Sequence, residues 1–108
     1  LVAMGAVTEE ALTQALARQL GVPVVDLAQA PIDAGCAAIL PVAAARARLA
    51  LPYRRDGDMV LVAMADPLDL ALINLVESRT GCRVEPRAAT AASIRAALDR
   101  IEATSPGT

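Results

Sequence analysis

The chain has 108 residues, a formal net charge of −2, and 56% hydrophobic against 20% charged residues, a balance typical of one globular domain and not of a disordered chain. It contains no His and no Lys, so its ten basic residues are all Arg, and Tyr53 is its one aromatic residue. This composition excludes histidine catalysis, Schiff-base chemistry and a P-loop, and it disfavours nucleic-acid binding, which uses positive charge and stacked aromatic rings.

The first predicted element is a helix over residues 9–20. Thr8 can cap its N-terminus, and Glu9 and Glu10 follow at the positive end of the helix dipole. Leucines and alanines then recur at helical spacing until Gly21 supplies a stop. A β-branched run over residues 22–27, with a proline near its start, predicts a short edge or entry strand.

Two short helices are expected next, over residues 34–40 and 41–47, because the alanine-rich segment is broken by Pro41. Asp33 can cap the first of them.

A β-hairpin is predicted around Asp56-Gly57, a dipeptide favoured in tight turns. The strand before the turn alternates apolar and other residues and contains Pro52, so it is expected near an edge. The strand after the turn, residues 59–65, is apolar throughout, which is typical of a central strand.

A third long helix is expected to begin with Asp66 as N-cap and Pro67 at the first helical position. Gly81 would close it, and its predicted buried stripe is Leu68, Leu72, Leu75 and Val76.

The last predicted elements are a strand over residues 82–87 with one dry and one wet face, and a helix capped by Thr90. The inward positions of this helix are Ile94, Ala97, Leu98 and Ile101, and Arg95, Asp99, Arg100 and Glu102 face outward.

These elements predict an α+β fold, a two-layer sandwich in which a small mixed sheet with a central β-hairpin packs against helices, in the order α-β-α-α-β-β-α-β-α. The strand–helix–strand segment over residues 59–87 would be a right-handed crossover between parallel neighbours. We expect an N-terminal helical element over residues 1–21, a core over 22–103, and a linker or frayed tail over 104–108.

No catalytic constellation is present, since the serines have no His to activate them and the carboxylates show no distinctive pairing. We therefore expect no catalytic residue, no metal site and no enzymatic activity. Cys36 and Cys82 lack a metal-binding or redox spacing and have small or apolar neighbours, so they are expected to be small buried hydrophobes. No segment is apolar for the length of a membrane span.

An arginine group surrounds the predicted hairpin: Arg46, Arg48, Arg54 and Arg55. Such a group can recognise carboxylates or phosphates, which makes these residues candidates for binding a partner. Arg83 and Arg87 form a second candidate. The alternative is an ordinary mixed-charge surface, because Asp56, Asp58, Asp66 and Asp69 are close in sequence.

Five segments, taken in order, resemble the N-terminal domain of type II secretion and type IV pilus assembly ATPases (the general secretory pathway protein E N-terminal, or MshE-N-like, family). The segments are LVAMG (1–5), TEE (8–10) with Leu12, Leu16 and Gln19, LGVPVVDL (20–27), LP (40–41) with LPYR (51–54), and VAMADPLDL (62–70). The similarity extends from residue 1 to about residue 103.

This resemblance implies a non-catalytic interaction domain that precedes a motor ATPase and docks on the cytoplasmic part of an inner-membrane platform protein. It implies a cytoplasmic location, peripheral to the inner membrane through that partner, and no transmembrane segment. The partners it implies are the platform protein and the C-terminal ATPase domain of the parent chain.

Some members of the family also bind cyclic di-GMP through tandem copies of the motif R-L-G-x-x-L-x-x-x-G-x6-L-x3-L-x2-Q. Its last five fixed positions match Leu1, Gly5, Leu12, Leu16 and Gln19. The leading Arg-Leu-Gly and the other copy have no counterpart in this sequence. Asp66 aligns with an acidic position that contacts guanine. The resemblance thus offers a second function, a cyclic di-GMP-binding regulatory domain, with no other cofactor.

Each of these residues also has a structural interpretation. Leu12 and Leu16 form the stripe through which any amphipathic helix packs on a core. Gln19 is ordinary as an exposed residue in a last helical turn, and Asp66 is explained as an N-cap.

Overall fold

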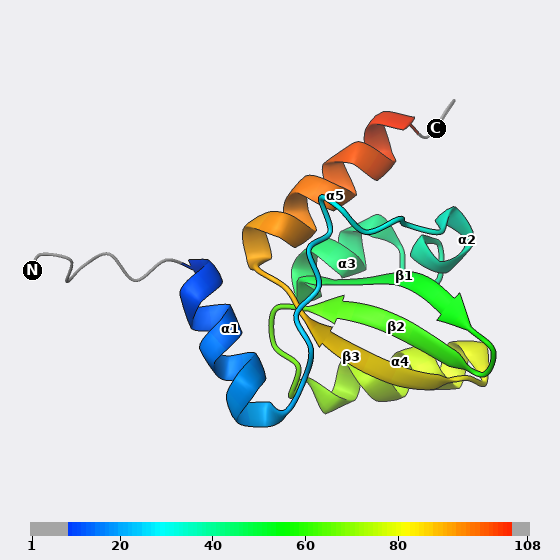
Figure 1. Cartoon of the computed structure of the whole chain (residues 1–108). Helices are drawn as coiled ribbons and strands as arrows, with labels where there is room; N and C mark the ends of the chain where they lie inside the picture. The colour runs from blue at the N-terminus through cyan, green and yellow to red at the C-terminus, as the bar shows by residue number, and fades with distance from the viewer. Residues whose placement is uncertain (1–8, 105–108) are drawn as a thin grey trace, which may run out of the picture.

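The structure, a computed structural model, describes residues 9–104 as helices packed around one small sheet (Figure 1). The elements are α1 (Glu9–Leu20), α2 (Ala34–Ala37), α3 (Val42–Arg48), β1 (Ala50–Asp56), β2 (Met59–Met64), α4 (Leu70–Thr80), β3 (Arg83–Ala88) and α5 (Ala91–Thr104). The strand order is β1-β2-β3, with β1 antiparallel and β3 parallel to β2. The α+β class and the mixed sheet are therefore confirmed.

The central strand is β2, as its continuous apolar sequence predicts. Val60, Val62, Ala63 and Met64 are at most 1% exposed. The hairpin turns at Gly57-Asp58, one residue later than the predicted Asp56-Gly57, because Asp56 is still paired with Met59. Gly57 adopts φ +61°, a left-handed conformation that glycine adopts at little cost. The β1–β2 register shifts between Pro52 and Arg54, so β1, which is an edge strand of the sheet, carries a bulge at this point.

The crossover from β2 through α4 to β3 creates the parallel pair, in register from Met59 opposite Arg83 to Met64 opposite Ala88. Leu72 and Val76 are the buried residues of α4. The helix ends at Thr80, and Gly81 is its C-cap, as predicted.

The start of α4 differs from the prediction. Asp69, and not Asp66, is its N-cap, and the Asp69 carboxylate accepts a hydrogen bond from the Leu72 N–H at 3.2 Å. Asp66 instead closes a turn with Pro67 at its second position, a position that proline favours. In this turn the Asp69 N–H donates to the Asp66 carbonyl and the Leu68 N–H to the Asp66 carboxylate. Leu68 is consequently exposed and not part of the buried stripe.

The strand predicted over residues 22–27 is wrong, and with it the second element of the predicted order. One parallel bridge joins Val24 to Ala88, with hydrogen bonds from the Val25 N–H to the Ala88 carbonyl and from the Ala88 N–H to the Pro23 carbonyl. Pairing stops there because the Asp26 carboxylate accepts from the Ala28 N–H and turns the chain.

On the outer edge of β3, each backbone N–H group either donates to an acceptor or is absent. The Val84 N–H donates to the Glu77 carboxylate at 3.1 Å, Pro86 has no N–H, and the Ala88 N–H meets the Pro23 carbonyl at 2.8 Å. An additional strand would therefore find no regular row of donors on this edge.

Helices α2 and α3 contact β1, and α5 contacts β1, β2 and α3. Asp33 caps α2 as predicted, accepting from the Gly35 N–H at 2.8 Å, although α2 ends at Ala37 and not at residue 40. Thr90 also caps α5 as predicted, through the Ser93 N–H. The fully buried large side chains of these layers include Leu27, Leu40, Leu51, Ile94 and Leu98.

Truncating Leu98 tests this core. Leu98 is 1% exposed, so Leu98→Ala removes buried methyl groups and leaves a cavity, and it should lower the free energy of unfolding by about 2–5 kcal/mol. Urea denaturation of the whole chain measures the change. Arg95→Ala, on the exposed side of the same helix, is the matched control and should stay within about 0.5 kcal/mol of wild type. Equal losses in both variants would contradict the assigned core.

Candidate functional site

The residues of α1 that match the cyclic di-GMP motif lie on one face of the helix. Leu12, Leu16 and Gln19 are spaced four and three residues apart, which aligns them along a helix. Leu12 is 60% exposed and Gln19 is exposed, whereas Ala17, on another side, is 2% exposed. The interpretation of Leu12 as a core residue is therefore wrong, because α1 packs through the side that carries Ala17. Leu16 is half-buried.

Two matching residues, Leu1 and Gly5, and the predicted cap Thr8 lie outside the described residues, as does the tail from residue 105 onward. The helix predicted over residues 9–20 is confirmed with those bounds. Gly21 follows it at φ +70°, which ends the helix in a left-handed conformation.

Asp66 lies in the turn that follows the carboxyl end of β2. Its side chain is exposed and accepts the hydrogen bond from the Leu68 N–H at 3.0 Å. The carboxyl end of the parallel neighbour β3 pairs with Val24, in the segment that continues α1. Because the carboxyl ends of parallel strands meet at one edge, the turn around Asp66 and the chain after α1 occupy the same end of the sheet (Figure 1).

The exposed large hydrophobic residues of the described chain also belong to α1 and this end of the sheet. They are Leu12 (60% exposed), Val24 (46%), Leu68 (60%) and Leu70 (65%). We call these four residues, with Leu16, Gln19 and Asp66, the strand-end surface. Exposed apolar side chains gathered in a few segments are typical of an interaction site.

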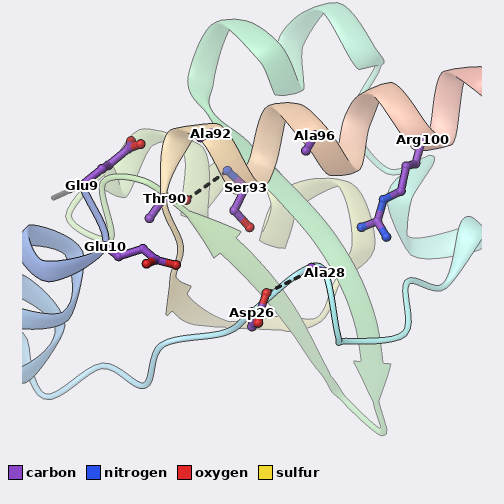
Figure 2. A pocket seen from close by; sticks show the side chains of 9 residues that line it. All are labelled: Glu9, Glu10, Asp26, Ala28, Thr90, Ala92, Ser93, Ala96 and Arg100. Atoms are coloured by element: carbon purple, nitrogen blue, oxygen red, sulfur yellow. Dashed lines mark hydrogen bonds between the residues drawn. The ribbon is translucent and has the colours of Figure 1, made fainter.

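A pocket of about 610 Å³ lies between α1 and α5 (Figure 2). The Glu9 carboxylate accepts a hydrogen bond from the Ala91 N–H at 2.8 Å, at the first residue of α5. Glu10 lines this pocket together with Asp26 and Ser93, and a neighbouring hollow of about 160 Å³ extends beneath α1. No group of three His, Cys, Asp or Glu side chains in residues 9–104 is arranged to hold a metal ion.

The four arginines predicted around the hairpin are not brought together. Arg46 contacts two carboxylates of α5, Asp99 at 2.6 Å and Glu102, and these hydrogen bonds raise the pKa of its guanidinium. Arg48 pairs with Asp69 at 3.5 Å.

Arg54 and Arg55 lie toward the other end of β1, beside the hairpin turn, and are exposed. Arg48 is the last residue of α3, whereas Arg54 lies four residues along β1 from its first residue, Ala50, which is roughly 13 Å of extended chain.

Arg87 pairs with Glu85 at 3.3 Å on β3, and Arg83 is exposed. Burial raises the pKa of the Tyr53 hydroxyl, while the charges of Arg87 and Arg54 oppose that shift. With Arg46, Arg48 and Arg87 each beside a carboxylate, this surface supports the mixed-charge interpretation.

Cys36 and Cys82 are free and buried, which confirms the prediction that they act as small hydrophobic residues. Burial raises the pKa of the Cys36 thiol, Asp33 adds to the effect, and Arg55 opposes it. A thiol of raised pKa is a poor nucleophile at neutral pH. No helix in residues 9–104 has the length and apolar character of a membrane span.

Sequence reasoning missed the Glu9 contact with α5 and the exposure of Leu68 and Leu70. The two leucines had a local signal, because Asp69 is as good an N-cap residue as Asp66 and a later helix start leaves Leu68 in the turn. The Glu9 contact had no such local signal, since its partner Ala91 is 82 residues away in the sequence.

Comparison with protein families gives one match, the MshEN domain, over residues 20–108. Among curated proteins the chain is similar to the type IV pilus assembly ATPase PilB of Myxococcus xanthus, with 33% identity over 103 residues, 95% of this chain and 18% of that protein. It is also similar to PilB of Thermus thermophilus, with 38% identity over 106 residues, 94% of this chain and 12% of that protein. The chain thus spans less than one fifth of the length of these relatives.

Among solved structures, a structure of MshE with cdg superimposes with a TM-score of 0.77 at 32% identity, covering 93% of this chain and 73% of that chain. The N-terminal domain of XpsE gives a TM-score of 0.74 at 23% identity, covering 90% of this chain and 68% of that chain. At this lower identity the likeness to XpsE shows the fold alone.

Proposed function

Because this chain belongs to the MshEN domain family, we propose that it is the non-catalytic N-terminal module of a type IV pilus or type II secretion assembly ATPase. The family resemblance inferred from the sequence is thereby confirmed. The relatives named above are assembly ATPases of which the chain matches a small part. Since this chain has no Lys and hence no P-loop, ATP hydrolysis in the parent protein would belong to a different domain.

The module is proposed to act in the cytoplasm and to dock the motor onto the cytoplasmic part of an inner-membrane platform protein. The observation that supports docking most is the strand-end surface, where Leu68 in the Asp66 turn is 60% exposed and Leu70, the first residue of α4, is 65% exposed. Burying such side chains against a partner is favourable, by about 1.5–3 kcal/mol for each leucine that becomes fully buried.

Arg54 and Arg55 are proposed as additional partner contacts. Arg46 and Arg48 already meet carboxylates of this chain, whereas no ion pair to a carboxylate is formed by Arg54 or Arg55 within residues 9–104. Their charge would accelerate association with an acidic partner more than it would raise the final affinity.

Calorimetric titration of the chain with the cytoplasmic domain of the platform protein from the same system tests docking. Wild type should bind, and Leu68→Asp with Leu70→Asp should weaken binding at least about tenfold, because two apolar contacts are lost. Both leucines are exposed, so the double variant should keep its fold. Arg54→Glu with Arg55→Glu should mainly slow association.

A control for this titration is Arg95→Ala, which alters an exposed residue outside the strand-end surface. It should bind as wild type does. A folded wild-type chain that shows no heat of binding and no association in a pull-down would contradict the docking function.

A second candidate function is the binding of cyclic di-GMP. It is favoured by the shared exposed face of Leu12, Leu16 and Gln19 and by the position of Asp66 at the same end of the sheet. The solved structure of the similar protein MshE contains cdg. In this function Leu12 and Leu16 would supply apolar contact, Gln19 a hydrogen bond, and the Asp66 carboxylate an acceptor for guanine N–H groups. Leu1 and Gly5 are proposed for the same site on the motif alone.

Titration of the full-length parent with cyclic di-GMP tests this second function. Gln19→Ala should weaken binding about three- to tenfold through the loss of one hydrogen bond. Gln14→Ala is the matched control, because Gln14 is exposed on the same helix but lines the hollow beneath α1. Asp66→Asn keeps an oxygen that can accept from the Leu68 N–H, so a loss of affinity in it reports the charge and not the turn.

Unchanged affinity in both Gln19→Ala and Asp66→Asn would contradict this assignment. Absence of binding by the full-length parent would dismiss the second function and leave docking unaffected.

A further inference from the structure

Glu9 belongs to α1, but its side chain makes a hydrogen bond to a different helix, α5. It lies in the first turn of α1, yet its carboxylate accepts the hydrogen bond from the Ala91 N–H at 2.8 Å, at the start of α5. Figure 2 shows Glu9 and Glu10 on α1, across the pocket from Thr90 and Ser93. One carboxylate therefore lies near the N-termini of two helices.

Helix α5 has no acidic residue in its own first turn. The first N–H groups of a helix have no partner within the helix and gather positive partial charge. The Thr90 hydroxyl accepts from the Ser93 N–H, and Glu9 satisfies the Ala91 N–H. Glu9 of α1 thus supplies the negative charge that the first turn of α5 lacks.

Helix α1 buries little of its surface against the rest of the described chain. Ala17 is its one buried residue, Leu12 is 60% exposed, and two hollows of about 610 and 160 Å³ lie between α1 and its neighbours. Leu16 and Leu20 are half-buried, so α1 gains less from apolar burial than a helix with several fully buried side chains would. The hydrogen bond of Glu9 is therefore a large share of what fixes the start of α1.

The chain beyond α1 is fixed firmly. Val24 pairs with Ala88, Leu27 is completely buried, and the Arg100 guanidinium donates to the Leu27 carbonyl at 2.8 Å. Gly21, at φ +70°, lies between this fixed segment and α1. The one residue that ends the helix is thus also the point about which it can turn.

We propose that α1 is a hinged helix that pivots at Gly21 and is held against the domain by the Glu9 contact with the N-terminus of α5. Glu9 is then a positioning residue for the strand-end surface, because the position of Leu12, Leu16 and Gln19 relative to Asp66 depends on it. Any ligand that binds the docked arrangement stabilises the Glu9 contact, and the Glu9 contact favours that ligand to the same degree. The proposal does not depend on which ligand or partner binds.

Amide hydrogen exchange of the whole chain, compared between Glu9→Ala, Glu10→Ala and wild type, tests the hinge. Both variants remove one carboxylate from the first turn of α1, so they affect the helix dipole of α1 alike. In Glu9→Ala, the amides of residues 13–20 should exchange about fivefold faster, because an undocked helix of this length is marginally stable. The NMR signal of the Ala91 amide should shift, and β2 should keep its wild-type rates.

Glu10→Ala should leave exchange in α1 within about twofold of wild type. Equal acceleration in both variants, or acceleration in α1 and β2 together, would overturn the proposal. Should Glu9→Ala fail to fold, Glu9→Gln replaces it; the amide oxygen can accept the same hydrogen bond without charge, so a smaller acceleration confined to α1 is expected. No acceleration in Glu9→Gln would overturn the proposal in that case.

Discussion

The parallel pairing of β2 with β3 is the constraint on which the rest of the molecule depends. Six residue pairs, from Met59 opposite Arg83 to Met64 opposite Ala88, bring both strands to an end at one edge. The turn around Asp66 leaves the sheet there, α5 begins there, and the segment after α1 bridges there to Ala88. That arrangement places Asp66 and Leu68 at the same end of the sheet as the segment that follows α1, which is the surface that we propose for binding.

Local chemistry was sufficient to predict most of the fold. Asp33 and Thr90 cap the predicted helices, Gly57 turns the hairpin, and the apolar run of β2 lies at the centre of the sheet. Predictions were wrong where two neighbouring residues suited the same structural role equally well, or where a residue distant in sequence determined the local structure. Asp66 and Asp69 are equivalent N-cap candidates, and residues 22–27 have strand propensity but form one bridge, because a β-strand exists only where a partner offers its backbone.

The candidate site was predicted less completely than the fold. The spacing of Leu12 and Leu16 indicated a packing stripe, but it could not show that α1 packs through Ala17 and leaves Leu12 exposed. Sequence proximity grouped Arg46 with Arg54, whereas the length of β1 separates them and α5 supplies the carboxylates that hold Arg46. The contact between Glu9 and Ala91 joins residues 82 positions apart and leaves no trace in either local sequence.

We propose that the sheet centred on β2 is a rigid frame and that α1 is attached to it more weakly, since Ala17 is the one buried residue of α1. Residue-resolved amide exchange of the wild-type chain tests this claim most directly, because protection reports how often each element opens. We expect the slowest exchange at Val60, Val62 and Met64, and, among hydrogen-bonded helix amides, the fastest exchange in α1. Amides of α1 that exchange as slowly as those of β2 would contradict it.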